Sequence, residues 1–226
     1  MAEAVAENIE EKNVLDYESG YHETRHPNHS NDEYYNARAK IALNKFFGDI
    51  DIKKRILDYG CGLGQNIFYL PNAVGYDISE YGVEQCRNKG INATTKLEEI
   101  PDKEFDYVFS SHVLEHHPHP KEMIGEMREK LKPGNDLLLV IPFERHGKAK
   151  FELDLNQHLH NWNFQNINNL LITCGFEIQQ NKYLYGAGYN RLLPLSRLSF
   201  GLYRFATHLI SRVFGIKEMM IVAKKK

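Results

Sequence analysis

The sequence predicts an α/β fold in which a mainly parallel sheet carries helices on both faces. Three observations support this prediction. A short apolar strand after Arg55 runs directly into a glycine-rich turn that ends at Gly64. A second short apolar strand, residues 73–76, ends beside the acidic Asp77. Residues 137–141 form an uninterrupted apolar run, which is typical of a parallel strand buried on both faces.

Residues 1–53 are predicted to form an N-terminal helical segment that acts as a lid. Residues 16–50 are rich in aromatic and histidine side chains, and a helix is expected at about 34–47. These side chains would suit closure over a water-poor site, but an N-terminal helix packed on the sheet would use the same ones. The candidate lid residues are Tyr17, Tyr21, His22, Arg25, His26, His29, Tyr34, Tyr35 and Arg38.

Residues 54–226 are predicted to form the main domain, in which strands and helices alternate. Lys89 and Gly90 end a helix that starts at Glu80, and Pro133 and Gly134 follow a second helix. Later strands are expected at 91–95, 107–111, 137–141 and 176–185, a helix at 121–131, and a final antiparallel strand at 216–223.

The glycine-rich turn and the acidic residue after it predict a site for a nucleoside-containing cofactor. Glycines let the backbone turn sharply and approach a ligand closely. A carboxylate at the end of the second strand can accept hydrogen bonds from ribose hydroxyls. An ordinary tight turn and a nicotinamide cofactor are alternatives, although Gln65 departs from the dinucleotide spacing and no Tyr-x-x-x-Lys pattern is found.

Four segments together carry a resemblance to a known family: residues 57–64, 75–79, 105–116 and 131–142. In order and spacing they resemble the class I, Rossmann-like S-adenosylmethionine-dependent methyltransferases, in particular the ubiquinone-type small-molecule group. The resemblance covers about residues 54–180. It implies a seven-stranded sheet whose last strand is antiparallel, with a helical insertion at 186–215 before that strand, and S-adenosylmethionine as the cofactor.

The resemblance also implies which residues bind the cofactor. The methionine portion would lie against the glycine-rich turn, the ribose at Asp77, the adenine beside Ile78, and the floor would be formed after the fourth strand. Residues 92–97 depart from the family, which often has an acidic residue near the adenine there. The implied cofactor-binding residues are Asp58, Gly60, Cys61, Gly62, Gly64, Asp77, Ile78, Ser110 and Ser111, with His112 beside them.

Histidines supply the candidate catalytic residues. A base is needed only if the methyl acceptor is a hydroxyl or a protonated amine, and histidine titrates near neutral pH. His158 and His160 follow the fifth strand, where this fold places residues that face the substrate, so they are the favoured candidates, with His112 next. Alternatively, one of the two caps the helix that starts near Asn163.

Composition excludes several classes of protein. A net charge of -2 gives no footprint for nucleic acid. Three widely spaced cysteines argue against a disulfide framework and a cysteine zinc site and favour a cytoplasmic location. The acidic start does not resemble a signal peptide, and no apolar run could span a bilayer. No metal is expected, because Pro118 and Pro120 interrupt the histidines at 112–119.

The predicted insertion carries an amphipathic stripe. Leu195, Leu198, Leu202, Phe205, Leu209 and Val213 recur at helical spacing, and residues 178–217 contain no acidic residue. Residues 191–214 therefore suit peripheral membrane contact, a homodimer contact, a cover for the core or a wall of the substrate pocket.

The predicted function is methyl transfer from S-adenosylmethionine to a small-molecule, glycan or lipid-linked acceptor by in-line displacement. A non-catalytic methyltransferase-like partner subunit and a protein or nucleic-acid methyltransferase are the alternatives. The sequence Ser110-Ser-His-Val113 lacks the Asn/Asp-Pro-Pro-Tyr element, and this disfavours amino-group methylation of bases.

Overall fold

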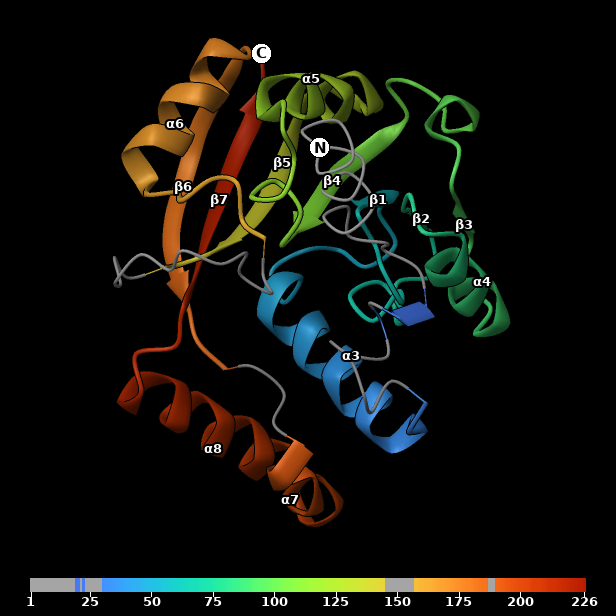
Figure 1. The fold of residues 1–226 in the computed structure, drawn as a ribbon, viewed down its shortest axis with the longest axis vertical. Helices are drawn as coiled ribbons and strands as arrows, with labels where there is room; N and C mark the ends of the chain where they lie inside the picture. Colours follow the sequence, from blue (N-terminus) through green and yellow to red (C-terminus); the bar gives the residue numbers. More distant parts are fainter. Residues whose placement is uncertain (1–18, 21, 23–29, 145–156, 187–189) are drawn as a thin grey trace, which may run out of the picture.

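The computed structural model describes residues 19–20, 22, 30–144, 157–186 and 190–226 (Figure 1). Within these residues, seven strands form one sheet in the order β3-β2-β1-β4-β5-β7-β6. The parallel pairs join β1 to β2 and β4, β2 to β3, and β4 to β5, whereas β7 is antiparallel to both β5 and β6. The predicted seven-stranded sheet with an antiparallel last strand is confirmed. The strands are β1 (Ile56–Tyr59), β2 (Ala73–Tyr76), β3 (Ala93–Thr94), β4 (Phe105–Ser111), β5 (Leu131–Pro142), β6 (Phe176–Leu184) and β7 (Glu218–Lys225).

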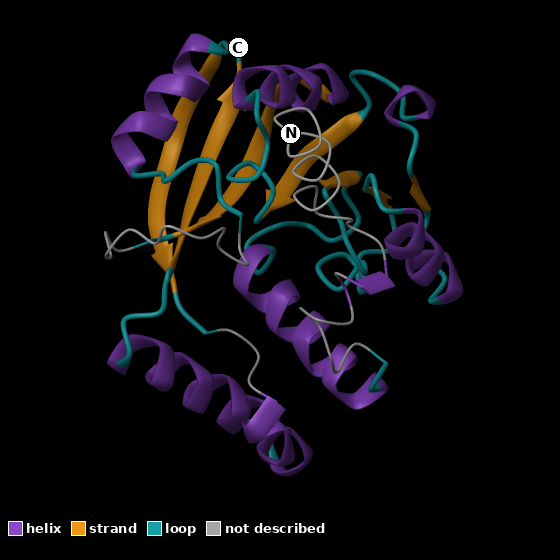
Figure 2. Ribbon diagram, in the orientation of Figure 1, coloured by secondary structure: helices purple, strands orange, loops and turns teal. Residues whose placement is uncertain are grey.

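Helices cover both faces of the sheet (Figure 2). Successive side chains of a strand point to opposite faces, and β5 shows the result. Its residues 137, 139 and 141 join the apolar cluster of α5 and α6, whereas residues 138 and 140 join the cluster of α3 and α4. The predicted apolar run is therefore buried on both sides. These helices are α3 (Asp32–Phe46), α4 (Glu80–Asn88), α5 (Pro120–Lys130) and α6 (Phe164–Thr173).

Local capping explains where two of these helices begin. The Ser79 hydroxyl accepts a hydrogen bond from the Gly82 amide and starts α4 directly after Asp77. Asn163 and Asn166 form a reciprocal capping box at the start of α6. The suggestion that a histidine caps α6 is therefore wrong, because the Asn163 side chain fills that position.

One strand begins earlier than the apolar pattern predicted. β5 starts at Leu131 rather than at residue 137, because Leu131 already pairs with Phe105 of β4 before an irregularity in the register. This places Pro133 and Gly134 inside the strand, at positions where the neighbouring ladder is interrupted. Five of the candidate lid residues lie outside the described residues: Tyr17, Tyr21, Arg25, His26 and His29.

The insertion forms two helices, α7 (Leu193–Leu198) and α8 (Phe200–Val213), as expected for residues 186–215. They lie beside α3, and α8 lies below the lower ends of β6 and β7 in Figure 1. Ala37 and Ile41 of α3 pack there against Leu193 and Tyr203. Among the described residues, no helix is long and apolar enough to cross a membrane.

Candidate active site

A cavity of about 810 Å³ opens at the carboxyl ends of β1, β2 and β4, under α3. Parallel strands bring their ends to one edge, so the loops after them meet there. Of the residues that the sequence analysis proposed for the site, Gly60, Cys61, Gly62, Asp77, Ile78, Ser111, His112 and His158 line this cavity. Asp58, Gly64, Ser110 and His160 do not belong to its lining. The Ser110 hydroxyl is buried and donates to the Tyr59 carbonyl.

The glycine-rich turn presents bare backbone to the cavity. Gly60, Gly62 and Gly64 all have positive φ, at 82°, 51° and 74°. A Cβ added at Gly60 would lie 2.2 Å from Cγ2 of Val113, so this turn presses against the segment after β4. A Cβ at Gly62 would meet only the His22 ring, at 3.9 Å. The backbone at Gly62 is thus the part of the turn that a ligand can approach.

Asp77 is fixed at the edge of the same cavity. Its carboxylate accepts the Gly62 amide at 2.7 Å and the Ser79 amide at 3.0 Å. Ile78 follows Asp77 in the sequence and lines the same cavity. Its surface is 63% exposed, which is unusual for a large apolar side chain. This pair of side chains fits a nucleoside, because the carboxylate can accept hydrogen bonds from ribose hydroxyls and the apolar surface can contact the nucleobase.

Asp58 lies behind the turn as a fully buried carboxylate. Neither of its oxygens makes a hydrogen bond of normal geometry to a described residue. Burial and the nearby Asp77 charge raise the pKa of Asp58 well above its usual range, and Asn66 opposes this only in part. A nearby cation would favour its ionised form, so this carboxyl group fits a cofactor that carries an ammonium and a sulfonium.

Four candidate lid residues can be placed, and one of them, Tyr34, packs against the apolar cluster that α3 forms with α7 and α8. His22 is buried, lines the cavity and stacks on Tyr81 with ring centroids 5.7 Å apart. Arg38 also lines the cavity, whereas the Tyr35 hydroxyl donates to the Leu63 carbonyl at 2.8 Å and holds α3 on the turn. His22 and Arg38 thus line the cavity while Tyr35 packs on the turn, and the lid stays a prediction.

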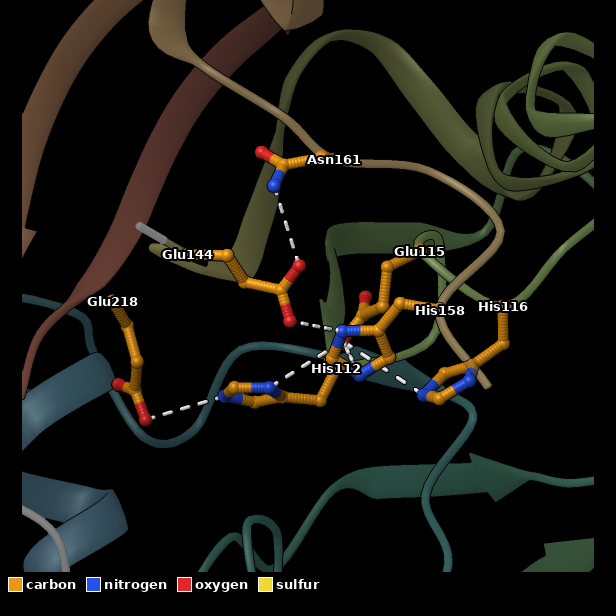
Figure 3. A network of polar contacts seen from close by, with 7 residues as sticks. All are labelled: His112, Glu115, His116, Glu144, His158, Asn161 and Glu218. Atoms are coloured by element: carbon orange, nitrogen blue, oxygen red, sulfur yellow. Dashed lines mark hydrogen bonds and ion pairs between the residues drawn. The ribbon is translucent and has the colours of Figure 1, made fainter. Parts of the chain in front are cut away.

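A network of acidic and histidine side chains lies on the other side of the cavity (Figure 3). His112 lies between Glu218, at 3.2 Å from Nε2, and Glu115, at 3.4 Å from Nδ1. Lys45 of α3 pairs with the other oxygen of Glu218. The network thus joins α3, the loop after β4 and the first residue of β7 at one point.

The charges in this network fix the protonation state of His112. Burial alone would lower the pKa of His112, but its hydrogen bonds to Glu115 and Glu218 raise it to about 9. Burial likewise opposes ionisation of Glu218, yet His112 and Lys45 lower its pKa to about 2. His112 is therefore a cation at neutral pH, which suits it to hold an anionic or electron-rich group rather than to remove a proton.

The ion pairs of His112 are expected to stabilise the fold over a limited pH range, and this stabilisation is lost in strong acid and in alkali. The folded-state pKa lies above the ordinary 6.5, so this stabilisation is complete below pH 6.5 and is lost as pH rises through about 9. The Glu218 contribution is present above pH 4.5 and is lost as pH falls towards 2. Thermal unfolding of wild type and His112→Asn should differ by about 1 kcal/mol between pH 4.5 and 6.5, since solvent screens the half-exposed ring.

Asparagine is the replacement of choice because it tolerates the positive φ of 57° at His112. The difference in unfolding free energy should shrink steadily between pH 7 and 10. A difference that stays constant over this range would contradict the assigned ion pairs.

His158 and His160 occupy different environments. His158 lines the cavity; its Nδ1 lies 2.5 Å from Oε1 of Glu144, and its Nε2 lies 4.0 Å from the buried Glu115. His160 instead places Nε2 3.0 Å from the His117 carbonyl and lies against Trp162. Of the two favoured catalytic candidates, only His158 reaches the cavity.

One group of side chains has the spacing of metal ligands. Glu115, His116 and His158 each offer one ligand atom, and these atoms lie within 4.8 Å of one another. Burial lowers the pKa of His116, which keeps its imidazole neutral, as a metal ligand must be. The group is a candidate position for a divalent cation where the sequence predicted none.

Sequence reasoning missed four charged residues of the network: Lys45, Glu115, Glu144 and Glu218. Glu115 could have been found, because an acidic residue directly before His116 follows the end of a strand. Glu218 lies 173 positions from Lys45. Their contact depends on the antiparallel direction of β7, which brings its first residue to the cavity.

Comparisons with known proteins agree with this geometry. The family model described as "Methyltransferase domain" matches residues 31–181, which is more than half of the chain. An uncharacterised protein of Methanocaldococcus jannaschii is 32% identical over 117 residues, covering 46% of this chain and 57% of the relative. A tRNA U34 carboxymethyltransferase of Pseudoalteromonas atlantica is 33% identical over 98 residues, covering 37% of this chain and 30% of the relative. The chain thus spans between 30% and 57% of the length of these curated relatives.

A solved structure shares the fold. Magnesium protoporphyrin IX methyltransferase of Synechocystis, determined with bound S-adenosylmethionine, has a TM-score of 0.55 at 17% identity, covering 85% of this chain and 80% of that one. The glycine-rich turn, the fixed Asp77 and the buried Asp58 agree with the family match. The chain belongs to the methyltransferase domain family.

Proposed function

We propose that this chain is an S-adenosylmethionine-dependent methyltransferase that acts on a small-molecule, glycan or lipid-linked acceptor whose hydroxyl or amine is deprotonated by His158. The observation that carries the proposal is the short contact between His158 and Glu144 at the wall of the cavity. A cavity of about 810 Å³ is within the range of sites that enclose small ligands.

The cofactor side of the cavity is assigned to the turn. Gly60 and Gly62 would hold the methionine portion, Asp77 the ribose and Ile78 the adenine. When bound, S-adenosylmethionine supplies a methyl group activated by a sulfonium. The protein has then to align the acceptor, exclude water and, for a hydroxyl or protonated amine, accept a proton.

His158 is oriented to accept that proton. Glu144 accepts a hydrogen bond from Nδ1, so the neutral ring carries its proton there and leaves Nε2 free to act as the base. This tautomer follows from the hydrogen-bond pattern. Asn161 donates to the other Glu144 oxygen at 3.5 Å and helps to hold the carboxylate. Once protonated, the imidazolium would lie between Glu144 and the buried Glu115, which stabilise its charge.

The proposal predicts a large effect at His158 and a smaller one at Glu144. With an acceptor found by screening sugars, lipid-linked glycans and small amines or phenols for S-adenosylhomocysteine release, His158→Asn should lower kcat about 100-fold. Glu144→Gln should lower kcat about tenfold, because the His158 ring loses the carboxylate that orients it. The part of the pH profile in which kcat rises with pH should also move.

His160→Asn is the matched control, since His160 lies close in sequence but outside the cavity lining. Its kcat should stay within twofold of wild type, and all three variants should bind S-adenosylhomocysteine normally. An unchanged kcat and pH profile in His158→Asn would refute the base assignment. Normal binding with no turnover on any acceptor would favour the non-catalytic partner role. Parallel assays with EDTA and with Mn²⁺ show whether the Glu115 group holds a cation that turnover needs.

A further inference from the structure

The insertion exposes an apolar face that the rest of the described chain does not cover. Leu202, Phe205, Leu209 and Val213 follow one another at three- and four-residue steps, so they form one line along α8. Their exposed fractions are 42%, 64%, 50% and 71%. Leu198 of α7, Phe214 and Ile216 flank this line in the sequence and are also exposed, and we call these seven residues the apolar face of α8. An exposed patch of this kind on one helix is typical of an interaction site.

The opposite side of α8 shows that this face is not a cover for the core. Tyr203, Thr207 and Ser211 are buried, so the helix turns its more polar side to the body of the protein. Tyr203 packs there with Ala37 and Ile41 of α3. The core-cover interpretation of the stripe is therefore not what the packing shows.

Charge identifies what covers the apolar face. Residues 178–217 contain six Lys or Arg residues and no Asp or Glu. Arg197 pairs with Glu33, but Arg212 is exposed beside the apolar face, with its guanidinium over the Tyr185 ring at 5.3 Å. Two copies of this surface would bring like charges together without acidic partners. A layer of anionic lipid matches both the apolar side chains and the positive charge.

A groove leads from this face to the active site. A second cavity, of about 440 Å³, lies between α3, the end of β6 and α8. It shares Ile41, Lys45 and Gly186 with the active-site cavity, and Phe205 of the apolar face is among its other lining residues. A chain that entered beside Phe205 would therefore reach Lys45, which lies next to His112 through Glu218.

We propose that the apolar face of α8 lies in the surface of an anionic membrane, and that the groove between α3 and α8 delivers an amphipathic acceptor from the membrane to the active site. The docking stands on the helix alone. Only the delivery step rests on the proposed function, and it narrows the acceptor to a molecule with a polar group to be methylated and an apolar tail.

Vesicle sedimentation of the full chain tests the docking. The protein should bind vesicles of phosphatidylcholine with 30–40% phosphatidylglycerol, roughly tenfold or more better than pure phosphatidylcholine, and the binding should weaken as salt is raised because exposed charges are screened. Leu202→Asp with Leu209→Asp should abolish it, since neither residue lines a cavity. Ile172→Asp is the matched control, because Ile172 is 54% exposed on the distant α6 and should bind as wild type does.

Each result decides between occupants. No binding of folded wild type to anionic vesicles at low salt overturns the proposal, as does equal loss in the Ile172→Asp control. Another outcome is that the wild-type protein forms a concentration-dependent dimer in solution that the Leu202 and Leu209 substitutions dissociate. That result would assign the apolar face of α8 to contact with a second copy of the chain. S-adenosylhomocysteine binding, measured on every variant, should not change, so a failure of docking is distinguishable from a failure of the methyltransferase site.

Discussion

Gly60→Ala is expected to lower the free energy of unfolding by about 3–5 kcal/mol, among the largest effects of a single substitution in this chain. Two costs combine at this position. The backbone has φ of 82°, which strains any residue with a Cβ, and that Cβ would lie 2.2 Å from the Val113 side chain. The turn also carries the Gly60 and Cys61 amides that donate to the Tyr76 carbonyl, so strain here loosens the whole cofactor edge. Urea unfolding followed by circular dichroism measures the loss.

Two further variants separate the strain from the clash. Gly90 has φ of 77° with no neighbour within 4 Å, so Gly90→Ala bears the backbone strain alone and should cost about 1 kcal/mol. Adding Val113→Ala to Gly60→Ala should recover part of the stability, because the contacted methyl groups are removed. If Gly60→Ala costs no more than Gly90→Ala, the tight contact between the turn and Val113 is wrong.

Asp77→Ala is expected to weaken S-adenosylhomocysteine binding by about 3–5 kcal/mol, which is a hundredfold to several thousandfold in Kd. A carboxylate that accepts from two ribose hydroxyls makes charge-assisted hydrogen bonds, and both are lost together. The Gly62 and Ser79 amides also lose the acceptor that holds the turn. Calorimetric titration with S-adenosylhomocysteine, in parallel with NADH, measures the change, and NADH should not bind.

Asp77→Asn provides the graded control, because the amide keeps one acceptor oxygen and nearly the same shape. Its affinity for S-adenosylhomocysteine should lie between those of wild type and Asp77→Ala, and its thermal stability should exceed that of the alanine variant because one acceptor oxygen remains for the Gly62 or Ser79 amide. Wild-type affinity in the alanine variant would show that the ribose does not lie at Asp77. If the wild-type protein does not bind S-adenosylhomocysteine, the assignment of the whole glycine-rich edge as the cofactor site is wrong.

Much of the fold followed from the sequence because its strands are buried and its helices are capped locally. The helix at 80–88 was predicted at its observed bounds, since Ser79 and Gly90 flank it on both sides. The start of β5 was not predicted, because it is set by the pairing of Leu131 and Asp136 with β4 rather than by an apolar pattern. Contacts between distant segments decide such boundaries, and a local pattern does not contain them.

The glycine-rich edge of the cavity was better predicted than the charged network for a similar reason. Gly60, Gly62, Asp77 and Ile78 come from two short segments whose spacing is itself a signal, and all four line the cavity. The charged network depends on ion pairs among α3, the loop after β4 and β7. From the sequence alone, a histidine is expected to act as a base near neutral pH. Only the two carboxylates around His112 show that this histidine is charged.

The position of β7 has a consequence for how the chain reaches its native state. Among the described strands, β6 pairs with β7 alone, and β7 is synthesised after the other six. Until it arrives, β5 presents an unpaired apolar edge, residues 137–141, and edges of this kind recruit other chains. Aggregation during synthesis should therefore depend on how fast the last eight strand residues insert. Substitutions in β7 would then reduce the yield of native protein before they alter any property of the finished enzyme.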